Sequence, residues 1–420
     1  MPNSRRNIIL KKMNMVSNTS TAEYKPIFVP IKDSKSVYGT GSTFDEGVQT
    51  IRLVSYNILA QVYVKSACFP HAPSHCLRWK VRSRAILERL LSFKADILCL
   101  QELDEYETFY KTQMDDHGYS SIYVKRPGKK KDGCGIFYRR DRLSLIENKI
   151  IQYNDLVPQT DGSGLLIDAA RISNEGLATS DGARISEEGL ATSDRGGHSI
   201  SGLLMDEERI TDEESATSDR GRGDPNDPRV RLKRDCVGIM AAFRVSRDVD
   251  STFIVTNTHI YWDPDWVDVK LAQVKYLVTC ISGFKRLLEA KLHTEIPFII
   301  CGDFNSTPGD QVYSYLISAE GSTMDNPGVS LSMEQKSEKC MPLYSLYASF
   351  KDEPDFTNFT PEFTGTIDYI FFSSFDIIKP SSLLVVPSAE SEDLKGGLPN
   401  QSHPSDHLPI GADCVIAFRA

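Results

Sequence analysis

Polar side chains that could take part in catalysis follow four short apolar segments of the chain, each just after the segment ends. They are Asn57, Glu102, His259, Asp303 and Asn305. Because strand ends on one edge of a sheet converge, and loops there build the active sites of α/β proteins, we expect these side chains to meet. Asn57 or Glu102 alone could instead cap a helix or hold a turn. Polar residues directly after a buried strand lower stability unless they are used, which favours a functional role for Asp303 and Asn305.

Two more carboxylates and a second histidine occur near the C-terminus. Asp368 begins an apolar run, and Asp406 directly precedes His407. A carboxylate beside an imidazole can orient or charge the histidine. Taken alone, His407 could also be a structural loop histidine, because prolines lie on both sides of it.

The complete set contains four carboxylates, two amides and two histidines, with no serine or cysteine paired to a base. Oxygen-rich sets select hard cations, Mg²⁺ before Zn²⁺. A site that has excess carboxylates and histidine donors but lacks a covalent nucleophile is typical of metal-assisted hydrolysis of a phosphate ester by water. A covalent acyl-transfer mechanism has no support in this set.

Composition excludes several classes of protein. With 420 residues, 40% hydrophobic and 25% charged, the chain is typical of a globular protein, and it has neither a membrane-spanning run nor the apolar block of a secretory signal. Asp and Glu (57) exceed Lys and Arg (48), so any nucleic acid is expected to bind at a local site. Nine cysteines without a C-x-x-C pair predict buried, reduced thiols in an intracellular protein.

The positioning elements are nine predicted strands and two predicted helices. The strand segments are 51–55, 96–101, 119–124, 135–138, 237–243, 252–258, 297–301, 368–372 and 412–418. Apolar stripes at helical spacing predict helices around 86–91 and 274–288. Strands interleaved with helices, several of them apolar on both faces, predict an α/β fold with two stacked sheets and helices packed outside.

Two segments are predicted to lie outside this core. Residues 159–230 contain no Phe, Trp, Tyr or Cys, and a 13-residue repeat begins at Ala170 and again at Ala183, so we predict a disordered surface insertion. Residues 1–49 are predicted to be a disordered basic tail, and an organelle transit peptide is the alternative for its first 22 residues. Residues 50–420 then form one catalytic domain that the insertion interrupts.

Six motifs, in this order, resemble the endonuclease/exonuclease/phosphatase superfamily. They are Ser55–Gln61, Leu100–Glu102, Asn257–His259, Gly302–Pro308, Ile367–Phe371 and Ser405–His407. Within the superfamily, Ser55–Gln61 and Phe356–Thr360 are similar to the deadenylase branch of carbon catabolite repressor protein 4 homologues, nocturnin and Angel proteins. The resemblance covers about residues 50 to 418 without the insertion.

The resemblance implies a four-layered α/β sandwich that hydrolyses the 3′-terminal phosphodiester of poly(A) and releases 5′-AMP, with one or two Mg²⁺ ions that Mn²⁺ could replace. It implies that Glu102 is the principal metal ligand, helped by Asn57 and Asp406. Asp303 would position or activate the attacking water, while Asn305 and His259 would donate hydrogen bonds to the phosphoryl oxygens. His407, braced by Asp368, would contact the scissile phosphate. Whether Asp303 or His407 is the general base stays open.

Base recognition would come from Pro264 and Phe363, which the resemblance places on either side of the terminal adenine. As alternatives, Trp262 beside Pro264 could be core and Phe363 a loop anchor. The basic run Lys125–Lys131 is either a solvated loop or a track for an RNA backbone.

Partners and location follow from the same resemblance. We expect poly(A) RNA as the partner, no membrane, and action in cytoplasm and nucleus, with a mitochondrion or other organelle left open by the basic N-terminus. Residues 1–49 show no leucine-rich periodicity, so association with the deadenylation complex is expected to be loose. The alternatives are a nocturnin-like NADP(H) 2′-phosphatase, a 2′,5′-oligoadenylate phosphodiesterase and a non-catalytic adaptor. The adaptor is disfavoured because all eight candidate residues are chemically competent.

Overall fold

The computed structural model describes most of the predicted domain. The described residues are 25–31, 50–160, 166–167, 224–245, 252–318 and 343–416. They belong to two units, one formed by Met1–Ile151 with Cys236–Ala420 and the other by Gln152–Asp235. Most of the predicted tail (1–49), most of the predicted insertion (159–230) with its repeat, and the last two residues of the predicted strand 412–418 lie outside the described residues.

The first unit contains a seven-stranded mixed sheet in the order β1-β16-β17-β2-β3-β5-β4. Its strands are β1 (Phe28–Pro30), β16 (Ile378–Leu384), β17 (Ile410–Ile416), β2 (Thr50–Asn57), β3 (Ile97–Gln101), β5 (Gly133–Arg139) and β4 (Tyr119–Lys125). β2 and β3 are parallel, and the other neighbours are antiparallel. The parallel pair places the C-terminal ends of β2 and β3 at the same edge.

A six-stranded sheet of the same unit has the order β12-β15-β11-β10-β9-β6. Its strands are β12 (Tyr344–Ser345), β15 (Asp368–Phe372), β11 (Phe298–Asp303), β10 (Thr252–His259), β9 (Val237–Val245) and β6 (Leu143–Gln152). Here β10 and β11 are parallel, while β15 runs antiparallel to β11. A small ladder joins β13 (Asn358–Phe359) to β14 (Thr364–Gly365).

The main core lies between the two sheets and explains where the polar residues point. Leu53, Cys99, Val255 and Cys301 belong to one buried cluster contributed by both sheets. Because side chains alternate along a strand, every second residue of β2, β3, β10 and β11 continues this inner face. The polar residues that end these strands therefore point between the sheets.

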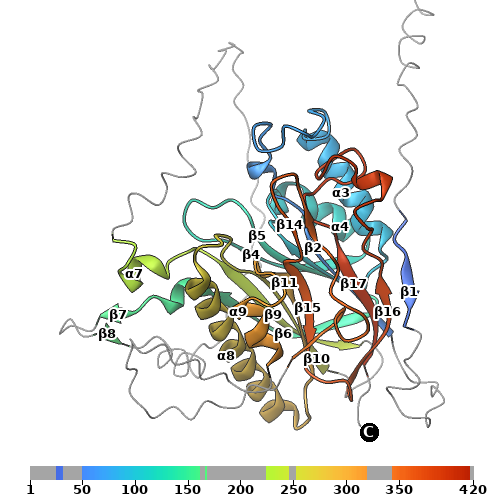
Figure 1. Cartoon of the computed structure of the whole chain (residues 1–420). Helices are drawn as coiled ribbons and strands as arrows, with labels where there is room; N and C mark the ends of the chain where they lie inside the picture. The colour runs from blue at the N-terminus through green and yellow to red at the C-terminus, as the bar shows by residue number, and fades with distance from the viewer. Residues whose placement is uncertain are drawn as a thin grey trace, which may run out of the picture. The chain divides into compact units, whose positions relative to one another are not determined.

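Helices cover the outer faces. The apolar stripe of α3 (Trp79–Ser92), with Ile86 and Leu90, packs together with α4 (Lys111–Asp116) against β2 and β3. Figure 1 shows α8 (Val267–Leu292) and α9 (Gln311–Ile317) side by side along the other sheet. The order helix, sheet, sheet, helix confirms the predicted four-layered α/β sandwich. Among the described residues, no helix is long and apolar enough to cross a bilayer.

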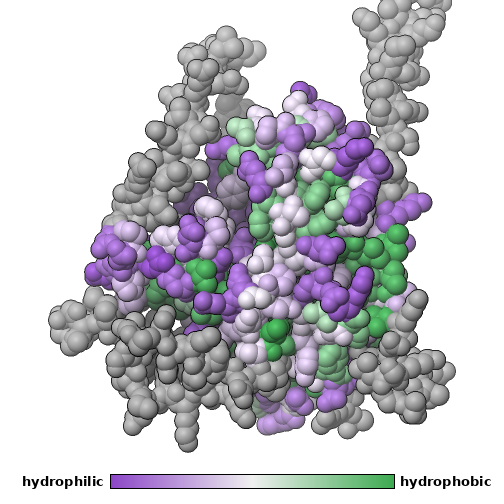
Figure 2. Space-filling view, in the orientation of Figure 1, coloured by the Kyte–Doolittle hydropathy of each residue, from purple (hydrophilic) through white to green (hydrophobic). Residues whose placement is uncertain are grey.

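All nine predicted strands are present in the described residues, and several strands were missed. Polar residues interrupt β6 and β16, so their sequences lack the continuous apolar run used for the prediction. β1 lies inside the predicted disordered tail and corrects that prediction for Phe28–Pro30: it pairs with β16, and the Arg52 guanidinium lies 3.9 Å from the ring centroid of Phe28. Figure 2 shows apolar side chains gathered along this edge, where Ile27 and Val29 are exposed.

The second unit contains the described ends of the predicted insertion. They form a two-stranded ladder, β7 (Gln159–Thr160) with β8 (Leu166–Ile167), and the short helix α7 (Pro228–Arg231). The Asp227 side chain caps α7 by accepting a hydrogen bond of 2.9 Å from the backbone N–H of Arg229. These short elements replace the predicted disorder at the two ends of the segment.

Candidate active site

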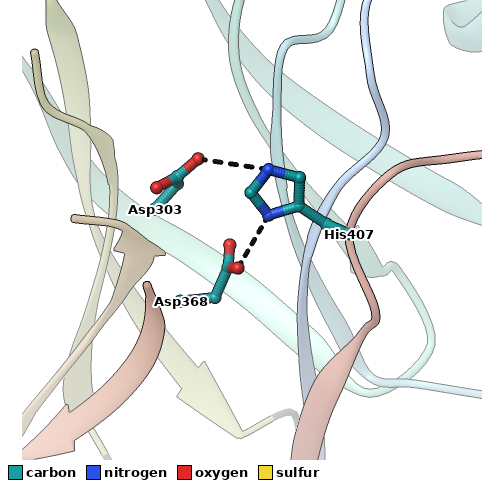
Figure 3. Close-up of side chains that lie close together, drawn as sticks. All are labelled: Asp303, Asp368 and His407. Atoms are coloured by element: carbon teal, nitrogen blue, oxygen red, sulfur yellow. Dashed lines mark hydrogen bonds and ion pairs between the residues drawn. The ribbon is translucent and has the colours of Figure 1, made fainter. Parts of the chain in front are cut away.

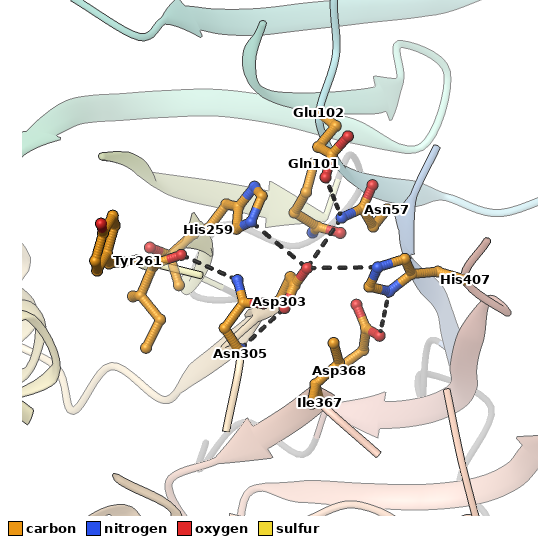
Figure 4. Close-up of polar contacts among 12 residues, drawn as sticks. Asn57, Gln101, Glu102, His259, Tyr261, Asp303, Asn305, Ile367, Asp368 and His407 are labelled. Carbon is orange, nitrogen blue, oxygen red and sulfur yellow. Dashed lines mark hydrogen bonds and ion pairs between the residues drawn. The ribbon is translucent and has the colours of Figure 1, made fainter. Parts of the chain in front are cut away.

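The structure brings together those predicted residues that Figure 4 labels: Asn57, Glu102, His259, Asp303, Asn305, Asp368 and His407. In the six-stranded sheet, His259 pairs with Asp303 and Asp303 pairs with Asp368, so three neighbouring strands present these side chains in a row. In the seven-stranded sheet, Asn57 pairs with Gln101, the residue before Glu102. Strand register therefore sets the spacing of the site.

Asp303 occupies the centre and connects the two sheets. Its Oδ2 accepts a hydrogen bond of 2.9 Å from Nδ2 of Asn57, and it lies 3.5 Å from Nε2 of His259 and 3.8 Å from Nε2 of His407. Its Oδ1 accepts the backbone N–H of Asn305 at 2.9 Å. Burial, followed by the negative charge of Asp368, raises the pKa of Asp303 to about 7.

His407 and Asp368 form a close pair (Figure 3). Nδ1 of His407 lies 2.7 Å from Oδ2 of Asp368, which also accepts the hydroxyl of Thr357 at 2.6 Å. Burial opposes the charged imidazole, but Asp368 and the neighbouring carboxylates outweigh it and raise the pKa of His407 well above its ordinary value. Asp303, Asp368 and His407 form a buried acidic and histidine cluster whose nearest ligand atoms lie within 4.8 Å of one another.

Glu102 faces the same centre from the other sheet. Its backbone has a φ of 53°, a left-handed conformation that costs a non-glycine residue about 1 kcal/mol. Oε1 accepts Nδ2 of Asn57 at 3.1 Å, and Oε2 accepts the backbone N–H of Ala60 at 3.0 Å. Burial, followed by the negative charges of Asp406 and Asp132, raises the pKa of Glu102 to about 8.

His259 has the opposite electrostatics from His407. Burial and then the positive charge of Arg126 lower the pKa of His259 to about 3, so this imidazole is neutral near pH 7. Arg126 belongs to the basic run and pairs with Asp132 at 3.4 Å. Asp132 is fully buried and also accepts the hydroxyl of Tyr63 at 2.7 Å. Sequence reasoning missed Asp132, although an acidic residue that directly ends a basic run was a usable signal.

The proposed base-binding residues lie in loops outside the hydrogen-bonded cluster. Pro264 is exposed, and Phe363 is 44% exposed with its ring close to Gly365, where an added Cβ would meet the ring at 3.0 Å. Trp262 is 61% exposed, so its interpretation as a core residue is wrong. The exposed ring of Trp262 lies on the loop after His259, and that of Phe363 lies on the loop before Asp368. Both rings offer apolar surface to a ligand.

A buried arginine ties two of the site segments together. The Arg82 side chain, 1% exposed on α3, donates to the carbonyl of Pro404 at 2.8 Å and to the carbonyls of Ile58 and Leu59 at 2.9 and 2.6 Å. These carbonyls lie just after Asn57 and just before the Ser405–His407 motif. Arg82 was missed by sequence reasoning, although it precedes the apolar residue Ile86 by one helical turn.

The donor set fits a hard divalent cation. The predicted ligands Glu102, Asn57 and Asp406 each carry a side-chain oxygen atom, and such cations prefer oxygen. Burial, followed by the charge of neighbouring carboxylates, raises the pKa of both Glu102 and Asp303, and a bound cation would stabilise their charged forms. Among the described residues, Oδ1 of Asp368 is a buried oxygen with no hydrogen-bond partner, which is a further unused donor atom.

Comparison with known proteins identifies the family of the chain. The chain matches the sequence profile of the Endonuclease/Exonuclease/phosphatase family over residues 54–173 and 222–407. It is 47% identical over 366 residues to carbon catabolite repressor protein 4 homolog 4 of Arabidopsis thaliana, covering 87% of this chain and 77% of that protein. It is 28% identical over 389 residues to the CCR4-Not complex 3′-5′-exoribonuclease subunit Ccr4 of Saccharomyces cerevisiae, covering 87% of this chain but 39% of that protein.

A solved structure shows the same fold. ANGEL2, described as a 2′,3′-cyclic phosphatase and crystallised with adenosine-2′,3′-vanadate, superposes with a TM-score of 0.61 at 22% identity, covering 94% of this chain and 99% of that one. The matching profile and the Arabidopsis relative each span most of the chain. The chain therefore belongs to the endonuclease/exonuclease/phosphatase family and is a carbon catabolite repressor protein 4 homologue.

Proposed function

We propose that this protein is a Mg²⁺-dependent 3′ to 5′ exoribonuclease that shortens poly(A) tails and releases 5′-AMP. Membership of the family makes it a hydrolase, and several relatives are named as 3′-5′-exoribonuclease subunits. The observation that carries the proposal is the position of Asp303, which contacts Asn57 of one sheet and lies within 4 Å of His259 and His407. One carboxylate thus lies among donors that can surround a phosphate.

In this proposal the chain's own residues orient water and phosphate. Asp303 holds the attacking water and accepts its proton, because Asp368 and the neighbouring carboxylates raise the pKa of His407 and keep its imidazole charged, so that His407 can donate but not accept. His407, fixed by Asp368, donates to the scissile phosphate. His259 and the side-chain amide of Asn305 donate to the phosphoryl oxygens as negative charge builds.

Glu102 would hold the cation, with Asn57 and Asp406 completing its surroundings. Asn57 would offer its Oδ1, the only side-chain atom of an asparagine that a hard cation accepts, while its Nδ2 donates to Glu102 and Asp303 and holds the amide in place. When bound, Mg²⁺ supplies positive charge that stabilises the pentavalent phosphate.

Substrate choice would come from the loops. Pro264 and Phe363 are exposed and would enclose the terminal adenine, since aromatic and apolar surfaces stack on bases. The exposed Lys125, Lys129 and Lys131 of the basic run would attract the RNA backbone. We propose action in the cytoplasm and nucleus and a loose association with the CCR4-Not complex, because relatives are named as its subunits.

The test is a comparison of substrates with wild-type protein and Glu102→Ala in Mg²⁺. The substrates are 5′-labelled RNA with a 3′ oligo(A) tail, the same RNA with oligo(U), a 2′,5′-linked oligoadenylate, NADPH, and RNA ending in a 2′,3′-cyclic phosphate. The proposal expects stepwise shortening of the oligo(A) tail alone, lost in Glu102→Ala. Release of phosphate from NADPH, cleavage of the 2′,5′ linkage or opening of the cyclic phosphate, with oligo(A) intact, would contradict the substrate assignment. Inactivity on all five would favour the adaptor.

A further inference from the structure

Two buried polar side chains interrupt the apolar face of α8 near its N-terminal end. Lys270 is 2% exposed and Gln273 is fully buried, one helical turn apart and next to the core residues Val269 and Val274. A buried ammonium group is expensive unless its hydrogen bonds are satisfied. Their partners therefore show what the two side chains do.

Both partners are backbone groups of the segments that carry site residues. Nζ of Lys270 donates a hydrogen bond of 2.8 Å to the carbonyl of Asn305. Oε1 of Gln273 accepts the backbone N–H of Tyr261 at 2.9 Å. α8 thus holds the segment after β10 and the segment after β11 at the same time.

The side chain of Asn305 completes a closed circuit of hydrogen bonds, and Figure 4 shows Asn305 beside the segment of Tyr261. Its Nδ2 donates to the carbonyl of Ile260 at 3.1 Å. That carbonyl belongs to the same peptide group as the N–H of Tyr261, so the peptide is held by Asn305 on one side and by Gln273 on the other. Consecutive hydrogen bonds therefore connect Lys270 of α8 to Asn305, Asn305 to the peptide between Ile260 and Tyr261, and that peptide to Gln273 of α8.

This circuit determines which end of the Asn305 amide is available. One N–H of Nδ2 is engaged by Ile260, which leaves the second N–H free to donate. A rotated amide would present its oxygen to an anionic phosphate and repel it. The backbone of Asn305 has a φ of 46°, a left-handed conformation that asparagine adopts more readily than most residues, and the hydrogen bond from Lys270 helps to hold it.

We propose that Lys270 and Gln273 are positioning residues that fix the amide orientation of Asn305 and the path of the backbone leaving His259. The inference rests on the proposed role of Asn305 as a phosphate donor. It predicts that removing either side chain lowers turnover while substrate binding through the outer loops is retained.

The first experiment measures kcat and KM of full-length Lys270→Met, Gln273→Met and Lys270→Arg. The matched control is Lys275→Met, an exposed lysine on the same helix. We expect kcat to fall by about 10²-fold for Lys270→Met and Gln273→Met, since small displacements of catalytic groups have effects of that size, with KM nearly unchanged. Lys270→Arg should recover part of the loss. Equal kcat in Lys270→Met, Gln273→Met and the control, with all of them folded, would overturn the proposal.

A double-mutant cycle separates positioning from a general loss of structure. In an Asn305→Ala background no amide remains to be oriented, so Lys270→Met should cause little further loss of kcat. A full, additive loss would contradict the proposed route through Asn305.

Amide hydrogen exchange gives a readout that does not depend on activity. The Tyr261 N–H should exchange faster in Gln273→Met, and it should keep its wild-type rate in Lys275→Met. An unchanged Tyr261 rate would overturn the positioning role of Gln273. If the wild type prefers a dinucleotide or a cyclic phosphate to poly(A), the proposed substrate fails, but the same variants measured on that substrate still decide the positioning role.

Discussion

The side-chain amide of Gln101 donates a hydrogen bond of 2.7 Å to Oδ1 of Asn257 across the layer between the two sheets. The same Nε2 contacts the hydroxyl of Ser55 at 3.1 Å, and Nδ2 of Asn257 donates to the carbonyls of Leu100 and Gly135. Gln101 directly precedes Glu102, and Asn257 lies two residues before His259. A buried polar bridge therefore fixes the two halves of the site relative to each other.

We expect Gln101→Leu to destabilise the fold. The change leaves Oδ1 of the buried Asn257 without this donor, and stranded buried polar groups cost about 1–3 kcal/mol. Urea unfolding of the wild type and Gln101→Leu measures the difference. Ser55→Ala, which leaves the bridge itself intact, should cost less. Equal unfolding midpoints for all three proteins would show that the bridge adds no stability.

Arg82→Met should lower the stability of the fold more than a typical substitution at the surface does. It removes a charged donor from the buried carbonyls of Ile58, Leu59 and Pro404, and hydrogen bonds to charged groups contribute about 1.5–3 kcal/mol each. Arg84→Met on the exposed side of the same helix is the control. Thermal unfolding should show a lower Tm for Arg82→Met alone, and activity should fall because the segments after Asn57 and before Ser405 lose their common anchor. A Tm matching that of the control would refute this.

His403 makes stability depend on pH. Nη1 of Arg89 lies 2.8 Å from Nδ1 of His403, so this nitrogen accepts, and Nε2 donates to Asp393 at 2.8 Å. Burial, followed by the charge of Arg89, lowers the pKa of His403 from 6.5 to about 4. Between these values the unfolded chain binds a proton that the folded chain does not, so stability is lost as pH falls from about 6.5 to about 4, by about 3 kcal/mol.

The measurement is the free energy of unfolding of wild type and His403→Gln across this pH range. Glutamine can accept from Arg89 and donate to Asp393 without titrating, so the drop should be smaller in the variant by about the same amount. Parallel pH profiles would show that His403 does not contribute.

Chelation of divalent cations should abolish activity, and added Mg²⁺ should restore it. Because Glu102 is crowded by Asp406 and Asp132, Mg²⁺ should also raise the Tm of the wild type, by a stabilisation of about 2.7 kcal/mol at a concentration of 100 Kd. Glu102→Gln should lose both effects. Full activity in EDTA would contradict the metal proposal.

Phe363→Ala should weaken binding of poly(A) more than it slows the reaction. Stacking of one base on an aromatic ring contributes about 1–3 kcal/mol, which corresponds to roughly a 5- to 150-fold higher KM. Phe363→Trp should keep a KM near that of the wild type. An unchanged KM in Phe363→Ala would remove this ring from the base-binding surface.

The sequence predicted the central residues of the site because they obey the two-residue period of a strand. Asn57, His259 and Asp303 each continue the inner, apolar face of a strand, and such a polar end is visible without a structure. The helices were visible from apolar residues at helical spacing, and the nine predicted strands from short apolar runs. The assignment of Trp262 to the core failed because an aromatic residue carries no information about which side of a loop it faces.

The supporting residues were not predictable in this way. Arg82, Lys270 and Gln273 bond to backbone groups of other segments, 12 or more residues away, and no local pattern encodes such a partner. The sequence shows only a polar residue next to apolar residues at helical spacing. Such a residue could be buried, or it could lie at the solvent-exposed edge of the apolar stripe. Short strands such as β1 were missed because their pairing partner, here β16, lies far along the chain.

The pairing of Asp303 with Asp368 makes the separation of these two carboxylates a property of hydrogen-bond register and not of loop conformation. Deleting a single residue inside β15 would turn Asp368 toward the helix layer and bring an apolar neighbour to face Asp303. His407 would then lose its partner, although every catalytic side chain would still be present in the chain. Loops at the opposite ends of β11 and β15 can change length without moving either carboxylate. Variation in this fold is therefore expected to accumulate as loop insertions, while the lengths of these two strands stay constant.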